Sequence, residues 1–487
     1  MAVHNGVADI VAELQERAAE RRPDDELLKE FLPIYYRELP EDDAEERSVH
    51  EMYGSAVQHL ALGRVRAPGE RRVEVVSPDY ERDGWHSDRS VLLFITDDVP
   101  FLVDTVRMVL DRFGLGIHLL VHPMLEVERN EADEMIGVSA SRFDRDRATA
   151  GDDGVEAWTQ IEIDRCPPDL HDQLEHDVRT AIDHVHRVVE DFAAMQERMV
   201  GLSDGDELLT WLASKHFVIL GASTYERTAD GLVPVKGSEL GEFRLDRGDH
   251  DDVQPDIIDP PSLEGDQEVV IARTSAVSRI HRAVRMTCVA IRPPGESREY
   301  RFLGLLGSGA YRESVFAIPV LGDRARDVLQ RASVSLDSHT GRAMKNVVET
   351  LPRDTVFELD ADALMPLVTD IVGLQERRIV RVFDVAEPVG PWTTVLVYIP
   401  KGRFAEGVPA DIAALVADRY GGETRDVETL LGTSSLARIS LTVRSVHRVD
   451  LDALAESIDD LTTTWEERTE DALVDALGEL EGLSLIH

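Results

Sequence analysis

Residues 91–123 change from a strand-like to a helix-like hydrophobic pattern and back, in the sequence VLLFITDDVPFLVDTVRMVLDRFGLGIHLLVHP. The apolar run 91–95 is rich in branched residues, which is typical of a buried strand. The residues that recur at helical spacing are Leu102, Val106, Val109, Leu110 and Phe113. Gly114 is placed to end this helix, and the apolar stretch 115–121 predicts a second strand.

The turn between that strand and helix is acidic, Asp97-Asp98-Val99-Pro100, and Phe101 follows it. It opens onto a helix N-terminus, where backbone N–H groups without an intrahelical partner can hold a small anion or a carboxylate. The pattern therefore indicates a sensor of a small metabolite and gives no sign of catalysis. An alternative is a capped helix start, with Asp97 or Asp98 as the N-cap and Asp104 in the first turn.

The remaining pattern alternates between helices and strands along the whole chain. Helical stripes precede residue 65, and apolar positions at spacings of three, four and seven predict a long helix over about 168–199. Residues 125–128 and 134–143 indicate a hairpin, residues 144–154 a charged loop and residues 237–261 a long loop. Further strands are predicted at 71–77, 159–164, 216–220, 269–272, 283–292, 299–306, 378–384, 393–400 and 436–444, with a poorly defined one at 423–430. Further helices are predicted at 207–214, 325–331, 341–350, 361–376, 410–420 and 451–480.

These elements predict six segments. They are an N-terminal helical segment (1–65), a first α/β domain with a long trailing helix (66–200), a second α/β domain (201–335), a helical connector (336–377), a third α/β domain (378–450) and the start of a helical region (451–487). The fold class expected is α/β (α+β).

Composition narrows the class of protein. Lys and Arg total 52 against 94 Asp and Glu, a formal net charge of −42, which disfavours nucleic acid and anionic membranes as partners. The two cysteines, Cys166 and Cys288, form no disulfide framework and no metal-binding spacing. The N-terminus lacks the apolar core of a signal peptide, and no apolar run approaches the ~20 residues that span a bilayer. We therefore expect a cytoplasmic protein.

Several blocks together carry a resemblance to a known family. They are the 91–123 unit, Trp211-Leu-Ala-Ser-Lys-His-Phe-Val-Ile-Leu-Gly221, Arg301-Phe-Leu-Gly-Leu, Ser308-Gly-Ala-Tyr311, Asp337-Ser-His-Thr-Gly-Arg, Leu351-Pro-Arg-Asp354 and Ser434-Ser-Leu-Ala-Arg438. From about residue 26 onward the chain resembles the N-terminal, non-catalytic portion of the large bacterial NAD-dependent glutamate dehydrogenases, and residues 91–123 resemble the first half of an ACT domain. The resemblance implies several ACT-like βαββαβ modules joined by long helices, in the first (66–200), second (201–335) and third (378–450) α/β domains.

The resemblance also implies a function. The whole enzyme would oxidise L-glutamate with NAD and water to 2-oxoglutarate, ammonium and NADH. In this family the catalytic domain and the NAD site would lie beyond His487, so this chain would hold no catalytic residue, cofactor or metal of its own. Its partners would be that C-terminal catalytic region, further copies of itself in a homo-oligomer, and an amino-acid effector.

By resemblance the effector site lies at the acidic turn. The candidate effector-binding residues are Asp97, Asp98, Val99, Pro100, Phe101 and Asp104. In ACT domains that bind amino acids a glycine usually follows the proline, so that the backbone can approach the ligand. Phe101 occupies that place here, so its side chain has to turn away from a bound ligand.

Other motifs in the sequence are weaker indications of a ligand or metal site. The turn Gly304-Leu-Leu-Gly307-Ser-Gly309 lacks the Lys-Ser/Thr of a nucleoside-triphosphate loop and has Arg312 where a dinucleotide fingerprint needs its third glycine, so a tight turn is expected. Histidines along the 168–199 helix have spacings of five and two, which do not place metal ligands on one face. His118 and His122 share a face on a strand, where hydrogen bonding is the expectation.

Four arginines lie in the most family-like stretch: Arg301, Arg312, Arg342 and Arg353. They could hold a carboxylate or pair with Glu299, Glu313, Glu349 and Asp354, and the pairing is favoured. The regulatory function has two rivals: a scaffold protein whose ACT-like folds bind no ligand, and an independent enzyme that uses the glycine-rich turn.

Overall fold

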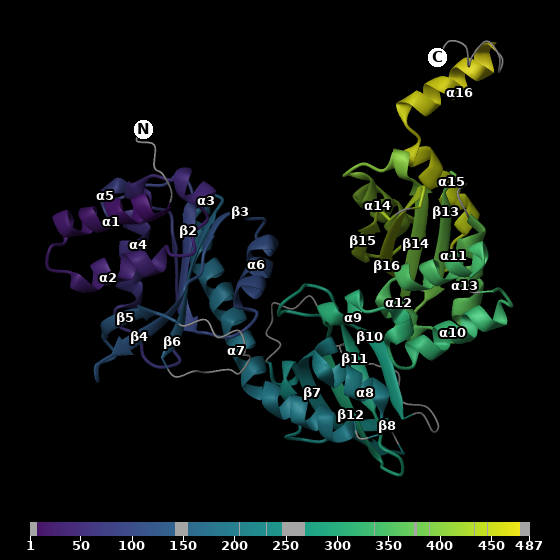
Figure 1. The fold of residues 1–487 in the computed structure, drawn as a ribbon, viewed down its shortest axis with the longest axis horizontal. Coiled ribbons are helices and arrows are strands. Elements are labelled where there is room, and N and C mark those ends of the chain that lie inside the picture. Colours follow the sequence, from purple (N-terminus) through teal and green to yellow (C-terminus); the bar gives the residue numbers. More distant parts are fainter. Residues whose placement is uncertain are drawn as a thin grey trace. The chain divides into compact units, whose positions relative to one another are not determined.

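The computed structural model describes residues 7–141, 154–203, 205–229, 231–245, 268–335, 337–374, 377–388, 390–432, 434–445 and 447–477. The predicted loop 144–154 and most of the predicted loop 237–261 lie outside these residues. The chain forms two compact units. Unit 1 holds residues 1–193 with the short segments Leu240–Leu245 and Ser278–Ala283, and unit 2 holds the rest (Figure 1).

Unit 1 is built around one antiparallel sheet. Its strands are β1 (Arg72–Val76), β2 (Ser90–Asp97), β3 (Ile117–Val121), β4 (Met124–Arg129), β5 (Met135–Ala140) and β6 (Val155–Ile163). They lie in the order β1-β2-β6-β4-β5, and β3 also pairs with β6. Helix α6 (Leu102–Arg112) connects β2 to β3, and α7 (His171–Leu202) follows β6.

Helices cover both faces of this sheet, which is why β2 is buried along nearly its whole length (Figure 1). Successive residues of a strand point to opposite faces. Ile95 therefore joins the core under the N-terminal helices, whereas the Thr96 hydroxyl lies 2.6 Å from His186 Nε2 on α7. Burial on both faces also hides the start of β6, which begins at Val155 and not at 159 as predicted, because apolar and polar positions do not alternate there.

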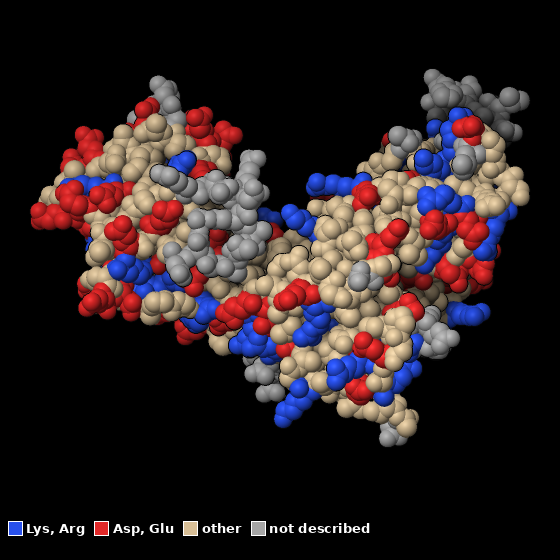
Figure 2. Space-filling model, turned by 60° about the horizontal axis from the view of Figure 1, so that its bottom comes forward, with Lys and Arg blue, Asp and Glu red and all other residues tan. Residues whose placement is uncertain are grey.

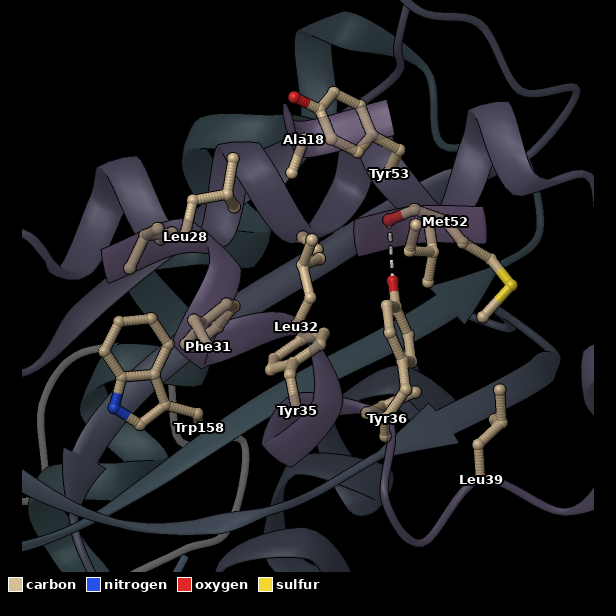
Figure 3. Close-up of a cluster of buried hydrophobic side chains, with 14 of the residues drawn as sticks. Ala18, Leu28, Phe31, Leu32, Tyr35, Tyr36, Leu39, Met52, Tyr53 and Trp158 are labelled. Atoms are coloured by element: carbon tan, nitrogen blue, oxygen red, sulfur yellow. Dashed lines mark hydrogen bonds between the residues drawn. The ribbon is translucent and has the colours of Figure 1, made fainter. Parts of the chain in front are cut away.

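The N-terminal helices are α1 (Val7–Arg21), α2 (Glu26–Tyr35), α3 (Glu41–Glu45) and α4 (Val49–Gly63), and α5 (Tyr80–Asp83) is one short turn. Their apolar stripes pack on the sheet around Trp158 (Figure 3), whose ring lies 5.2 Å from that of Phe31. Tyr36 donates its hydroxyl to the Met52 carbonyl at 2.8 Å. The described residues 7–65 of the segment 1–65, predicted as a segment of its own, thus share one hydrophobic core with the first sheet.

Unit 2 contains two sheets. The first is formed by β7 (Phe217–Thr228), β8 (Gly231–Pro234), β10 (Val269–Val277), β11 (Arg285–Ile291) and β12 (Arg298–Leu306), in the order β10-β11-β12-β7-β8. No helix separates β10, β11 and β12, and this succession differs from the βαββαβ order of an ACT-like module. The other helices of unit 2 up to residue 374 are α8 (Glu207–Trp211), α9 (Ser308–Arg312), α10 (Leu321–Arg331), α11 (His339–Thr350), α12 (Arg353–Glu358) and α13 (Ala361–Leu374).

The second sheet of unit 2 has four antiparallel strands in the order β13-β14-β16-β15. They are β13 (Arg381–Ala386), β14 (Trp392–Pro400), β15 (Thr424–Leu430) and β16 (Leu436–Arg444). Helix α14 (Val408–Tyr420) connects β14 to β15, and α15 (Leu451–Thr462) follows β16, with α16 (Trp465–Leu477) after it. Gly421 ends α14 with φ of 63°, the left-handed conformation common at helix ends.

This sheet and that of unit 1 share one topology. In both sheets the first strand (β1 or β13) lies beside the second (β2 or β14). A helix (α6 or α14) then leads to β3 or β15, two places away from the second strand. The last strand, β6 or β16, lies between these two. The β4–β5 hairpin is an insertion into this plan. In the βαββαβ order the outer strand follows the second helix of the module. Here the outer strand, β1 or β13, comes before the module. The predicted fold class, α/β with ACT-like modules, is confirmed.

Candidate functional site

The turn from β2 into α6 gathers the predicted effector residues at one place. Strand β2 ends at Asp97, and Phe101 is the N-cap of α6, with φ of 71° and no side-chain cap hydrogen bond. The alternative that Asp97 or Asp98 caps this helix is therefore wrong. Phe101 adopts the left-handed backbone conformation that usually selects glycine, so this position keeps the geometry of a glycine without its open space.

The two aspartates of the turn have different surroundings. Asp97 accepts a hydrogen bond of 2.6 Å from Arg66 Nη2, and the same guanidinium pairs with Glu156 at 2.9 Å. Asp98 is half-buried, and its backbone N–H donates to the Val155 carbonyl. Burial raises the pKa of the Asp98 carboxyl above its usual range. A positively charged group added at this turn would therefore stabilise the Asp98 carboxylate more than the Asp97 carboxylate, which already has a cationic partner.

A later segment of the chain, Ser278–Ala283, belongs to unit 1 and contacts the first turn of α6. The His281 N–H donates to Thr105 Oγ1 at 3.1 Å, and His281 Nδ1 lies 2.9 Å from Asp104 Oδ2. The Phe101 and His281 rings are 4.8 Å apart. Sequence reasoning found Phe101 and Asp104 but missed Thr105 and His281, because no local pattern links positions 176 residues apart.

The glycine-rich turn packs against the start of β7. A Cβ on Gly304 would collide with the Val218 carbonyl oxygen, one on Gly307 would lie 2.9 Å from the Lys215 carbonyl oxygen, and one on Gly309 would lie 3.1 Å from the His216 ring. These glycines permit close approach of two backbones. The expected tight turn explains them without a bound phosphate.

Two of the family-like blocks meet beside this turn, around Glu313. Its carboxylate accepts from Trp211 Nε1 at 2.8 Å and lies 3.3 Å from His216 Nε2, and the Trp211 and His216 rings stack at 4.1 Å. Arg353 Nη2 donates to the Glu313 carbonyl at 2.9 Å. Of the predicted arginine pairings, Arg301 with Glu299 is present, at 2.7 Å and buried.

Buried charges in unit 2 form a network that the sequence did not indicate. Arg285 holds Glu387 through two hydrogen bonds of 3.1 and 2.7 Å, and Arg273 lies 2.9 Å from both Glu387 and Glu358. All four side chains are at least nine-tenths buried. The Arg285 guanidinium lies 4.0 Å from the centre of the Trp392 ring.

The two histidines on the predicted strand both bond to protein groups. His118 pairs with Asp164 at 2.7 Å and His122 with the Thr159 hydroxyl at 2.6 Å. Burial lowers the pKa of His122 and that of His186 to about 4. Among the described residues, no three His, Cys, Asp or Glu side chains gather as metal ligands, and no helix has the length and apolarity needed to cross a membrane. Acidic and basic side chains are interspersed over the face shown in Figure 2.

Comparison with protein families gives three matches along the chain. The ACT1 domain of glutamate dehydrogenase matches residues 31–178, helical motif 1 of glutamate dehydrogenase matches 318–377, and its ACT2 domain matches 381–466. Together the three ranges cover more than half of the chain. The two ACT ranges contain the two sheets of shared topology, and the first begins within α2, so it includes helices of the predicted N-terminal segment.

Curated relatives agree with these matches. The NAD-specific glutamate dehydrogenase of Halomonas elongata is 27% identical over 510 residues, and that of Pseudomonas aeruginosa is 28% identical over 514. These alignments cover 97% and 98% of this chain but 31% of each relative. The NAD-specific glutamate dehydrogenase of Mycobacterium tuberculosis is 26% identical over 409 residues, which is 79% of this chain and 24% of the relative. The chain thus spans less than a third of the length of these relatives.

Proposed function

Because the chain belongs to the glutamate dehydrogenase family, we propose that it is the regulatory and oligomerising part of an NAD-dependent glutamate dehydrogenase. The whole enzyme would convert L-glutamate, NAD and water to 2-oxoglutarate, ammonium and NADH. The observation that carries the proposal is that the ACT1 and ACT2 matches fall on two sheets that share one topology apart from the inserted β4–β5 hairpin. The catalytic residues and the NAD site would belong to the part of the relatives that this chain does not span.

The effector would be an amino acid bound at the β2–α6 turn. Its ammonium group would face the half-buried Asp98 carboxyl, and its carboxylate would face backbone N–H groups at the first turn of α6. The N-cap Phe101 supplies no side-chain acceptor to those groups, which supports this assignment. Binding would act on the enzyme by favouring one arrangement of its domains over another.

A thermal-shift screen of the purified chain against the common amino acids, 2-oxoglutarate and NAD tests the proposal. A ligand that binds only the folded state raises stability by RT ln(1 + [L]/Kd), so a millimolar site shows at high concentration. We expect a shift with an amino acid in the wild type that Asp98→Ala abolishes and Asp164→Ala leaves in place. A shift with NAD would contradict the assignment of the NAD site to the part of the relatives that this chain does not span. NADH formation from glutamate by this chain alone would contradict it as well.

A second candidate function is a scaffold that pairs subunits and binds no small molecule. The contact of His281 with Phe101, Asp104 and Thr105 favours it, since the first turn of α6 already has a protein partner. The scaffold predicts no shift with any of these compounds, and Asp98→Ala would then have only a small effect on stability.

A further inference from the structure

The segment Ser278–Ala283, which we call the strap, is the connection between β10 and β11 apart from Val284 and belongs to unit 1. It is a compact structure. The Ser278 hydroxyl donates to the Ile280 carbonyl at 2.7 Å, and the Arg282 N–H donates to that carbonyl at 2.8 Å. Ser278 and Ile280 are almost wholly buried. The strap therefore has a defined conformation against its surroundings.

Its contacts fall on the residues that an amino-acid ligand of α6 would have to approach. His281 contacts the N-cap Phe101 through its ring, Asp104 through Nδ1 and Thr105 through its backbone N–H. Thr105 is buried and Asp104 half-exposed, so the strap contacts both a buried and a solvent-facing residue of this helix turn. His281 itself has φ of 69°, a conformation that non-glycine residues adopt only when their surroundings hold them there.

We propose that the strap is an autoinhibitory element that occupies the effector position of α6 and has to leave it before an amino acid binds there. The proposal rests on the proposed function, because it names the regulation of the same turn. The free energy of strap release then opposes effector binding. The apparent affinity is the affinity for the released form multiplied by the fraction of chains whose strap is released. Effector binding would therefore increase the exposure of the strap to solvent and protease.

Limited trypsin digestion of the full chain tests this, because trypsin cleaves after Arg279 and Arg282, both within the strap. His281→Ala removes the ring contacts, and Thr105→Val removes the acceptor of the His281 N–H at nearly constant volume. Each variant should raise cleavage within the strap, measured by mass spectrometry, by about fivefold to tenfold, as the loss of one hydrogen bond to the docked state predicts. Equal cleavage in the wild type and both variants would overturn the proposal.

His118→Ala is the matched control. His118 and Asp164 form a pair of 2.7 Å with side chains 33% and 52% exposed, close to the 27% and 50% of His281 and Asp104. Its loss should leave strap cleavage unchanged. Faster strap cleavage in His118→Ala as well would mean that any loss of such a pair loosens unit 1, which would overturn a specific docking contact.

Ligand addition separates this proposal from the proposed function. An amino acid from the thermal-shift screen should speed strap cleavage in the wild type and bind His281→Ala more tightly. Binding to the wild type without faster cleavage would overturn the strap and keep the effector site. If no amino acid binds even His281→Ala, the effector function fails, and the strap as a docked element is decided by the cleavage rates alone.

Discussion

At the scale of single residues, contacts from distant parts of the chain set the state of the β2–α6 turn. The left-handed conformation of Phe101 costs a non-glycine residue about 1–2 kcal/mol, and its ring contact with His281 offsets part of that cost. Asp97 is held by Arg66, whereas burial acts on Asp98 with no other cause of its pKa shift. Neighbouring carboxyls of one turn therefore have different surroundings.

We expect Asp98→Asn to stabilise unit 1 at neutral pH. Burial raises the pKa of Asp98 in the folded state. Protonated Asp98 therefore adds to the free energy of unfolding below the unfolded pKa of about 4, and this contribution is lost as pH rises through the folded pKa. The neutral amide avoids this loss. Thermal unfolding from pH 4 to 8 should show an advantage of the variant that grows with pH.

Asp164→Asn provides a control of opposite sign. The hydrogen bond from His118 lowers the pKa of Asp164, so its charge stabilises the folded state above the unfolded pKa and that contribution is lost as pH falls. The variant should be less stable than the wild type at neutral pH. An Asp98→Asn variant that is less stable than the wild type at pH 8 would show that the Asp98 carboxylate is paired in solution.

At the scale of elements, close approach of two backbones explains the glycines that resemble a nucleotide-binding turn. Strands β12 and β7 pair along their length, and their register shifts between Leu303 and Gly304. At that irregularity Gly304 lies directly against the Val218 carbonyl. The strand pairing therefore requires a residue without a side chain, whatever function the turn has.

Gly304→Ala should destabilise unit 2 by about 1–3 kcal/mol, because the added methyl group meets backbone that cannot move without disturbing the β7–β12 pairing. Chemical denaturation followed by circular dichroism measures the change. In Gly373→Ala the methyl group has no atom within 4 Å and lies on helix α13, so this control should gain up to about 1 kcal/mol. Equal stability of the two variants would contradict the close approach.

At the scale of the whole molecule, both units have a hydrophobic core, and buried ion pairs join parts of the chain that are far apart in sequence. Unit 1 joins its N-terminal helices to its sheet through aromatic and aliphatic packing around Trp158. Unit 2 adds the buried network in which Arg273 of β10, Arg285 of β11 and Glu387 after β13 meet. Buried ion pairs require near-ideal geometry, so this network fixes which strands of unit 2 lie together.

Glu387→Gln should destabilise unit 2 by about 3–5 kcal/mol, since it leaves the Arg285 charge buried without its carboxylate. Hydrogen exchange of β10, β11 and β14 should accelerate while that of β2 and β6 stays unchanged. Glu226→Gln, which breaks a largely exposed pair with Arg298, is the control and should change the stability little. A cost for Glu387→Gln no larger than this would mean that solvent reaches the network.

The sequence by itself predicted most of the helices and strands, because hydrophobic period, glycine stops and short polar turns are local signals, and its resemblance to a known family supplied the ACT-like class. It also located the turn that carries Asp97, Asp98, Phe101 and Asp104. Only the tertiary structure decided that the N-terminal helices share the core of the first sheet, that His281 contacts α6, and that Arg285 meets Glu387. Those contacts join residues far apart in the chain, and their partners are chosen by packing and burial, which no local pattern records.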